Sequence, residues 1–364
     1  MWVFLLDKMT FADRLTTVTQ DEILPQVVDA ILGGNFITFR FLSNAKRWNG
    51  ESLKKPVKIA KNELGGSFSG LDTHSTATVD TRRMLTYRVK GYEIPVAIPG
   101  MEKAVNRTPA QVINLVKVEL ESSQADAMDD IGTILYADGT GNGGKDFEGF
   151  DNLIDDGTSV ATFGELTRTT YDPYLDSTRT ASGGTLTLAK LATLVSAVSV
   201  GGGPRNRPSV FISDETVWNL YEELLSPTVR ENYNAFGLPS VTRTSKAPLR
   251  GAELGGAAGY VSLSYRGIPW VSDEKSTAET IWAANENYIN WYGLKDSDLR
   301  QIGMGGGTID GPYSEAPSKN VGFQWTGFMR PINQYGEVAH LYLLGNLVNW
   351  QAVRHGRLTG VTGV

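Results

Sequence analysis

The 364-residue chain is long enough for two domains or one elaborated domain, and its 41% of hydrophobic residues suffices for a sizeable core. Its net charge of −6 argues against a general nucleic-acid binder, and the lack of cysteine excludes disulfides, thiolate catalysis and cysteine-ligated zinc. The 40 glycines indicate many turns and long loops, and no apolar run approaches the roughly 18 residues that a membrane span needs.

The N-terminal region combines a short predicted helix with an apolar cluster. The apolar stretch at 1–6 is too short for a secretory signal peptide. Thr19 and Glu22 have the spacing of a capping box, which predicts a helix over 19–32 that ends at a glycine pair. Two interpretations stay open for the phenylalanine-rich cluster at 36–42: a buried strand or helix of the core, or an arm that packs on another subunit.

Residues 46–100 have no helical period and are punctuated by glycines. Short alternating stretches such as 84–89 predict a long two-stranded excursion. Between Arg40 and Lys90 there are eleven lysines and arginines against four aspartates and glutamates, a local net charge of +7. Because an isolated hairpin is at best marginally stable in water, we expect this excursion to lie on another surface. Its candidate contact residues are Lys54, Lys55, Lys58, Lys61, Arg82 and Arg83.

A long helix is predicted over 108–138. Thr108 and Gln111 have capping-box spacing, Pro109 occupies the first helical position, and apolar residues then recur every three or four positions. At 1.5 Å per residue the rod is about 45 Å long. Its other face is acidic, since the segment carries one lysine against six carboxylates, and this face is either solvated or a contact surface. The candidate contact residues on the helix are Glu119, Glu121, Asp126, Asp129 and Asp130.

The basic excursion directly precedes the acidic helix, and this adjacency is informative about function. A compact enzyme rarely needs an unsupported excursion next to a rod-like helix. A subunit that reaches out and lies across its neighbours does need one, so the pair favours a self-associating structural protein.

Downstream of the long helix, strands and helices are mixed without the βαβ rhythm of a parallel sheet. Asp214 is predicted to cap a helix that ends before Pro227, and 303–307 is predicted to be a loop. Because helices are combined with antiparallel strands, the fold class is α+β. The other predicted elements are a helix at 186–200, a buried strand at 209–213, strands at 260–271 and 280–292, and paired strands at 323–329 and 338–347.

The glycine run at 139–144 matches a dinucleotide-binding loop in its letters only. A phosphate-binding loop needs a strand before it and a helix N-terminus after it, whereas here a helix precedes the run. The same stretch imitates the first half of a calcium loop, but Gly149 stands at the twelfth position, where a bidentate glutamate is needed. We interpret the run as a flexible hinge after the helix and expect no nucleotide, cofactor or metal.

The histidines do not form a catalytic constellation in the sequence. We expect His340, in an apolar strand, to be a core histidine, and His355, between Arg354 and Arg357 in the tail, to be solvated. His74 lies in a serine- and threonine-rich part of the excursion. No general base has a visible partner, so the sequence predicts no enzymatic activity.

Five short stretches, in order along the chain, carry a family resemblance. They span about residue 20 to residue 360, and their order and spacing are more specific than any one of them. In these stretches the chain resembles the major capsid proteins of tailed bacteriophages, which have the Hong Kong 97-type fold. The stretches are Asp21–Pro25, Lys61–Gly70, Asp129–Thr133, Asp138–Phe147 and Arg354–Gly360.

The resemblance implies a domain plan. The N-terminal arm would cover 1–48, the extended loop 49–105, the peripheral domain with its spine helix 106–148, the axial domain 149–317, and the return to the peripheral domain 318–364. In this family the extended loop of one subunit lies over a neighbour's spine. Here the two regions carry net charges of +7 and −5, so complementary fields would orient the contact.

The resemblance also implies a structural role. Pentamers and hexamers of the chain would close into an icosahedral head around double-stranded DNA, which is enclosed without sequence-specific binding. The shell would belong to a virion that is assembled in the cytoplasm of the bacterial host, with no membrane. The implied partners besides the chain itself are a portal and scaffolding or cement proteins.

Two other functions stay open at this point. An encapsulin-like compartment would share the fold but hold protein cargo in place of DNA. Abundant tryptophan, tyrosine and glycine are also compatible with a secreted polysaccharide-active enzyme, which would need paired carboxylates across a cleft.

Overall fold

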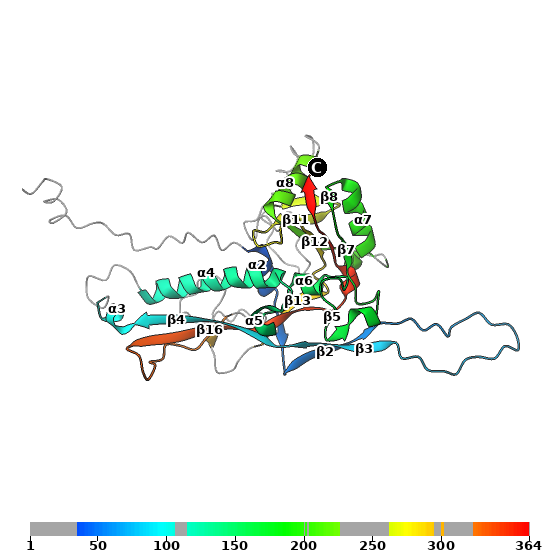
Figure 1. Ribbon diagram of the computed structural model, residues 1–364. Helices are drawn as coiled ribbons and strands as arrows, with labels where there is room; N and C mark the ends of the chain where they lie inside the picture. Colours follow the sequence, from blue (N-terminus) through cyan, green and yellow to red (C-terminus); the bar gives the residue numbers. More distant parts are fainter. Residues whose placement is uncertain are drawn as a thin grey trace, which may run out of the picture.

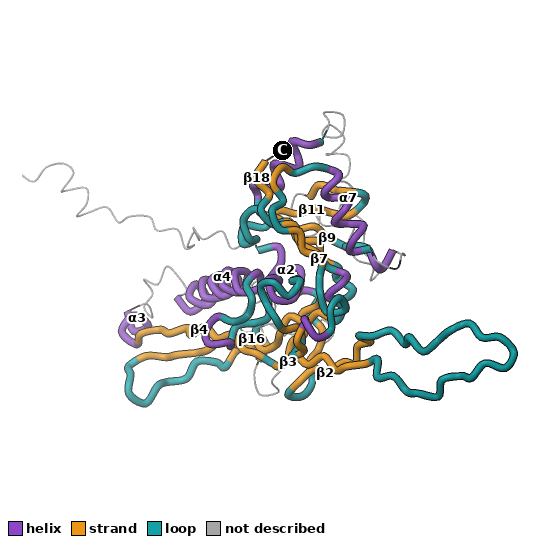
Figure 2. The backbone as a smooth tube through the Cα atoms, turned by 45° about the vertical axis from the view of Figure 1, so that its right-hand side comes forward, coloured by secondary structure: helices purple, strands orange, loops and turns teal. Residues whose placement is uncertain are grey.

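The computed structural model describes residues 35–105, 115–199, 201, 204–225, 262–294, 300–301 and 323–363. Figure 1 shows a flat lower unit built on a long helix and a long antiparallel strand pair, with an upper unit standing on it. A thin hairpin leaves the lower unit on the side away from the long helix (Figures 1 and 2). The predicted helix at 19–32, the predicted cap at 108–111 and the predicted loop at 303–307 lie outside the described residues.

The lower unit is a mixed sheet covered by helices. Its strand order is β1-β13-β16-β15-β14, with β4 beside β16. Its elements are α2 (Phe36–Ser43), β1 (Lys46–Trp48), β4 (Lys90–Pro99), α3 (Gly100–Val105), α4 (Leu115–Tyr136), β13 (Ile289–Leu294), β14 (Arg300–Gln301), β15 (Gln324–Trp325) and β16 (Gly336–Asn349).

A long strand pair of the lower unit joins β4 to β16 in antiparallel register, from Pro99 opposite Gly336 to Lys90 opposite Gly345. Exposure alternates along β4, because successive side chains of a strand point to opposite faces. Helix α4 covers one face of this strand pair (Figure 1). Val96 and Leu341 are buried on that face, whereas Pro95 is exposed on the other. The predicted pairing of 323–329 with 338–347 is confirmed by β15 and β16.

His340 is not a core histidine, and that prediction is wrong. It lies opposite Pro95 on the open face of the β4–β16 strand pair, so its side chain is only half-buried. Its Nδ1 lies 2.8 Å from Glu93 Oε1, and its ring stacks on that of Tyr342. The apolar run around His340 reflects one buried face of the strand, and the histidine lies on the other.

The cluster at 36–42 forms helix α2 of the core, so the first of its two interpretations is confirmed. Phe36, Ile37, Phe41 and Leu42 are all buried, and the helix packs against α4 and β13. Arg40 of the same helix lies beside Glu286, with Nε 2.5 Å from Oε1.

Gly132 allows the chain entering α2 to approach the middle of α4. A Cβ at this glycine would overlap the side chain of Asn35. Asn35 Nδ2 donates to the carbonyl of Met128 over 3.0 Å, so the approach is held by a hydrogen bond. The glycine therefore sits inside a helix despite its low helix propensity, because close packing needs the missing side chain.

The upper unit is built on a six-stranded sheet with the order β10-β11-β9-β12-β17-β7. The predicted buried strand and the predicted helices on either side of it are confirmed, and Asp214 occupies the N-cap position of the second helix without a side-chain capping hydrogen bond. Its elements are β7 (Thr178–Thr180), β8 (Gly184–Thr185), α7 (Leu188–Val198), β9 (Val210–Ser213), α8 (Glu215–Leu224), β10 (Ser262–Tyr265), β11 (Ile268–Ser272), β12 (Ile281–Ala284), β17 (Gly356–Leu358) and β18 (Val361–Gly363).

Two predicted strands are each divided in the structure. The stretch at 260–271 is the hairpin β10–β11, because Arg266 and Gly267 both have positive φ angles (51° and 78°), as a tight two-residue turn requires. The stretch at 280–292 divides into β12 and β13, which belong to different sheets. The segment between β12 and β13 therefore connects the upper unit to the lower one.

His355 is fully buried, so the prediction of a solvated tail is wrong. Strand β17, which directly follows it, lies between β12 and β7 inside the upper sheet. The Nδ1 atom of His355 accepts a hydrogen bond from the backbone N–H of Asn285 over 3.1 Å. Burial lowers the pKa of His355 to about 3, because a charged imidazolium would be desolvated there.

Arg357 of the same strand is also buried, at the centre of an ionic cluster. Its guanidinium donates to the carboxylates of Asp151 and Asp155. Asp155 additionally accepts from three backbone N–H groups, those of Gly157, Ser159 and Val160. A buried carboxylate held this way is a structural anchor for the chain around it.

Among the helices that the structure describes, none is long and apolar enough to cross a membrane.

Candidate subunit interface

The predicted two-stranded excursion exists, but it is shorter than 46–100. Strands β2 (Ser52–Lys58) and β3 (Arg82–Arg88) pair in antiparallel register, with Ser52 opposite Arg88 and Lys58 opposite Arg82. The residues after β3 turn back as β4 and join the lower sheet. The projecting hairpin is therefore 52–88, and its long connecting loop reaches into open space in both views (Figures 1 and 2).

Residues 61–80 of the projecting hairpin are exposed throughout. They include four large apolar side chains, Leu64, Phe68, Leu71 and Val79, which are 44%, 68%, 102% and 41% exposed. Apolar side chains scattered singly are normal on a surface, but several on one unsupported loop are a feature of contact sites.

The root of the hairpin is fixed to the body of the chain. Leu85 and Tyr87 of β3 are buried in the main core. The N–H of Thr86 donates to the carbonyl of Gly164 over 3.0 Å, and the exposed pair Arg88–Glu165 lies alongside at 2.7 Å. Gly164 and Glu165 form the turn between β5 (Thr162–Phe163) and β6 (Leu166–Thr167). The hairpin thus leaves the body in a defined direction.

The six predicted basic contact residues differ in their surroundings. Lys54, Lys58, Lys61 and Arg82 are exposed, and no described carboxylate pairs with them. Lys55 lies over the ring of Trp350, with Nζ 5.0 Å from its centroid.

Arg83 makes hydrogen bonds within its own chain. It donates to Asp80 and, over 3.2 Å, to the hydroxyl of Tyr171. The guanidinium therefore has a local role at the hairpin root.

The predicted acidic residues on α4 also divide. Asp129 receives a hydrogen bond from Lys275 Nζ over 2.8 Å, and this bond raises the pKa of Lys275. Asp130 accepts from the hydroxyl of Tyr92 over 2.6 Å. Glu119 and Asp126 are half-buried without a described partner.

Glu121 belongs to α4, but its side chain is not among those that the structure describes. Two of the five predicted acidic residues, Asp129 and Asp130, therefore have partners in their own chain.

The projecting hairpin and α4 lie on opposite sides of the lower unit (Figures 1 and 2). The structure therefore does not bring the predicted basic and acidic residues together within one chain. A contact between them requires a second copy.

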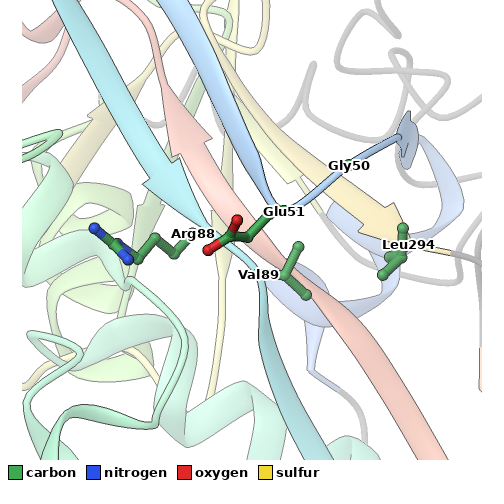
Figure 3. A pocket seen from close by; sticks show the side chains of 5 residues that line it. All are labelled: Gly50, Glu51, Arg88, Val89 and Leu294. Carbon is green, nitrogen blue, oxygen red and sulfur yellow. The ribbon is translucent and has the colours of Figure 1, made fainter.

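An open pocket lies where the projecting hairpin meets the lower sheet. It has a volume of about 440 Å³ and is lined by Gly50, Glu51, Arg88, Val89 and Leu294. In Figure 3 the Glu51 side chain lies between Gly50 and Arg88. A single carboxylate (Glu51) and a single guanidinium (Arg88) at an open pocket do not form a catalytic constellation.

Sequence reasoning missed Lys90, which fixes the junction between the projecting hairpin and strand β4. Its Nζ lies 3.0 Å from Glu148 Oε1 and also donates to the carbonyls of Gly139 and Asp146. The glycine run, which we expected to be a flexible hinge, is therefore a tight turn held against β4 by Lys90. It contains α5 (Gly141–Gly144), a single turn in which Asn142 and Gly143 have left-handed dihedral angles. In the sequence, Lys90 stands in a stretch where apolar and polar residues alternate. A lysine at such a position is equally compatible with a side chain in solvent, so the pattern did not predict this role.

Comparison with known protein families and with curated proteins gives no match. Solved structures do match over nearly the whole chain. The capsid of cyanophage A-1(L) has a TM-score of 0.65 at 15% identity, covering 95% of this chain and 98% of the other. The capsid of Myoviridae phage XM1 has a TM-score of 0.56 at 13% identity, covering 97% and 99%.

The chain shares the fold of these capsid proteins. The SrpI encapsulin of Synechococcus elongatus also matches, with a TM-score of 0.53 at 13% identity over 97% of this chain and 96% of the other. The predicted combination of helices and sheets is confirmed. At such low identity the likeness establishes the fold, and function needs a separate argument.

Proposed function

We propose that this chain is the major capsid protein of a tailed double-stranded DNA bacteriophage. It acts as a structural subunit, without catalytic activity, that assembles into pentamers and hexamers of an icosahedral head. The single observation that carries the proposal is the projecting hairpin in a chain with a capsid fold. Its loop is exposed throughout, so a second copy must cover it if it is to be stabilised.

The domain plan of the Hong Kong 97-type fold supports this proposal. Helix α4 would correspond to the spine helix. The projecting hairpin would correspond to the extended loop, and the upper unit to the axial domain. The arm, proposed as 1–48, would end in α2 and β1, which belong to the core of their own subunit. The extended loop, proposed as 49–105, would end at β3, because β4 joins the lower sheet.

We further propose that the basic hairpin of one copy lies on the α4 helix of a neighbour. Because Asp129 and Asp130 are already bonded in their own chain, the acidic side of this contact would centre on Glu119, Glu121 and Asp126. Lys54, Lys58 and Lys61 supply the unpaired positive side. Complementary charges of this kind set the orientation of a contact more than its affinity.

The specific alternative is an encapsulin-like compartment, which the match to the SrpI encapsulin favours. Its TM-score of 0.53 is below the 0.65 of the cyanophage capsid, so the phage proposal stays first. Portal, scaffolding or cement partners, enclosed DNA and assembly in the host cytoplasm belong to the phage proposal and would be absent or different in a compartment.

Sedimentation and electron microscopy of the purified full-length protein test the proposal. We expect closed shells under some condition of salt and protein concentration. A compact monomer under every condition would contradict a shell subunit. Nucleic acid inside particles isolated from cells would favour the capsid, and protein cargo would favour the compartment.

A further inference from the structure

The dipeptide Asn-Gly occurs twice in this sequence, at 49–50 and at 142–143, and both copies are exposed. This dipeptide is chemically labile in proteins. The backbone nitrogen of the glycine attacks the side-chain carboxamide of the asparagine, and glycine has no Cβ to obstruct the attack. The two copies stand in different surroundings, so the structure discriminates between them.

Asn49-Gly50 connects β1 to β2, at the root of the projecting hairpin. Buried Trp48 holds the carbonyl of Gly50, with Nε1 donating to it over 2.9 Å. The N–H of Gly50 makes no hydrogen bond to any described residue, and the position of a Cβ there has open space within 4 Å. The nucleophile and the carboxamide are therefore both free in solvent, and no backbone hydrogen bond must break.

The charges around Gly50 favour the reaction. The attacking species is the amide anion, which nearby positive charges stabilise. Lys46 and Arg47 are exposed just before the dipeptide and have no described carboxylate partner. The nearest carboxylate in sequence is Glu51, whose side chain extends toward Arg88 in Figure 3.

Asn142-Gly143 has the opposite surroundings. Asn142 is held in the left-handed region (φ 50°, ψ 37°), in a turn closed by the N–H of Gly144 donating to the carbonyl of Thr140 over 3.0 Å. The carboxylate of Asp138 binds Thr140, and that of Asp146 lies against the adjoining backbone. A fixed turn flanked by negative charge disfavours the amide anion and the rotation that ring closure needs.

We propose that Asn49 is a site of spontaneous deamidation that modifies the root of the projecting hairpin. Gly50 N bonds to Cγ of Asn49, ammonia leaves, and a five-membered succinimide forms. Water then opens either carbonyl of the ring, which gives aspartate or isoaspartate without an oxidant or an enzyme.

The product adds a carboxylate two and three residues after Arg47 and Lys46, cations without a described carboxylate partner; Lys46 Nζ lies 5.6 Å from the centroid of the Tyr292 ring. Isoaspartate also inserts one methylene into the main chain between β1 and β2. Both changes occur where the hairpin leaves the body, so deamidation alters the direction and mobility of the hairpin as the protein ages.

Peptide mapping of the folded full-length chain tests the site. Trypsin releases Asn49 in peptide 48–54 and Asn142 in peptide 118–145, so one digest reports both after incubation in mildly alkaline buffer. We expect aspartate and isoaspartate to accumulate several-fold faster at Asn49, and at similar rates at both sites in urea. Equal rates in the folded chain, or a faster Asn142, would overturn the proposal.

Asn49→Gln tests the consequence, because the longer side chain closes its ring far more slowly and the exposed position tolerates the change. We expect ageing to change the rate of limited proteolysis within 61–80 in the wild type and to leave the variant unchanged. An equal change in both proteins would show that deamidation at Asn49 does not act on the hairpin.

Discussion

Two antiparallel strand pairs belong to the lower unit, and only one of them is covered within the chain. The β4–β16 pair joins segments far apart in the sequence, is flanked by β13 and β15, and lies under α4, which buries one of its faces. The β2–β3 hairpin contacts the body at its root and is exposed from 61 to 80. Backbone pairing is similar in both, so the difference is burial. A hairpin without a covered face is marginal in water, and the projecting one is therefore expected to depend on a neighbour.

The largest expected effect of a single substitution is at the buried ionic cluster. Arg357→Met leaves the buried carboxylate of Asp155 with only Arg179, 3.5 Å away, as a counter-charge, and breaking a buried ion pair typically costs about 3–5 kcal/mol. Chemical denaturation of the unassembled protein measures the loss. The matched control is Arg88→Met in the exposed pair at the hairpin root, where we expect no measurable change. Equal losses in the two variants would contradict the distinction between body and hairpin.

A slightly smaller loss of unfolding free energy is expected for a substitution in the covered β4–β16 strand pair. Leu341→Ala removes a fully buried side chain beneath α4, and such a cavity costs about 2–5 kcal/mol. Leu71→Ala, on the exposed loop, should change the unfolding free energy of the monomer by less than about 0.5 kcal/mol. If Leu71→Ala destabilised the monomer as strongly, the loop would be packed on its own chain.

The pH dependence of stability should report His355. Its folded pKa of about 3 lies below the ordinary value of 6.5, so as pH falls the unfolded chain binds this proton first. The His355 contribution is complete above pH 6.5 and is lost toward pH 3, by up to about 1.4 kcal/mol per pH unit.

We expect His355→Gln to flatten this part of the profile, and His74→Gln, in the exposed loop, to retain the wild-type slope. Denaturation midpoints at several pH values measure both variants. An unchanged slope in His355→Gln would mean that another group controls the acid sensitivity.

The smallest effect on the monomer is expected from charge reversal in the projecting hairpin. Lys54→Glu, Lys55→Glu and Lys58→Glu together should barely change monomer melting, because exposed pairs contribute about 0–1 kcal/mol each. The contact recurs at every subunit of a shell, so particle yield should fall, and added salt should weaken wild-type assembly in the same direction. Normal yield at low salt would refute the electrostatic part of the proposal.

The sequence predicted the elements whose signals are local. The 3.6-residue period placed α4, and the Asp214 cap placed α8, because caps and apolar stripes act over a few residues. The basic composition of 46–90 identified the projecting hairpin. The ends of that hairpin were not predictable, because β4 looks alike in sequence whether it pairs with β3 or with β16.

The failed predictions all depend on partners that are distant in the chain. His355 and Arg357 read as a polar tail, yet their partners are 70 and more than 200 residues away. The acidic face of α4 read as uniform, although Lys275 and Tyr92 engage two of its carboxylates. Polar residues carry no periodicity that distinguishes a buried ion pair from a solvated one.

The dependence of the projecting hairpin on a neighbour is tested most directly by hydrogen exchange, measured by mass spectrometry on separated monomer and particle fractions. In the monomer we expect the amides of 61–80 to exchange rapidly, while those of β4 and β16 are protected. In the particle we expect protection to extend over the projecting hairpin. Protection of 61–80 already in the monomer, or no gain of protection in the particle, would contradict the account.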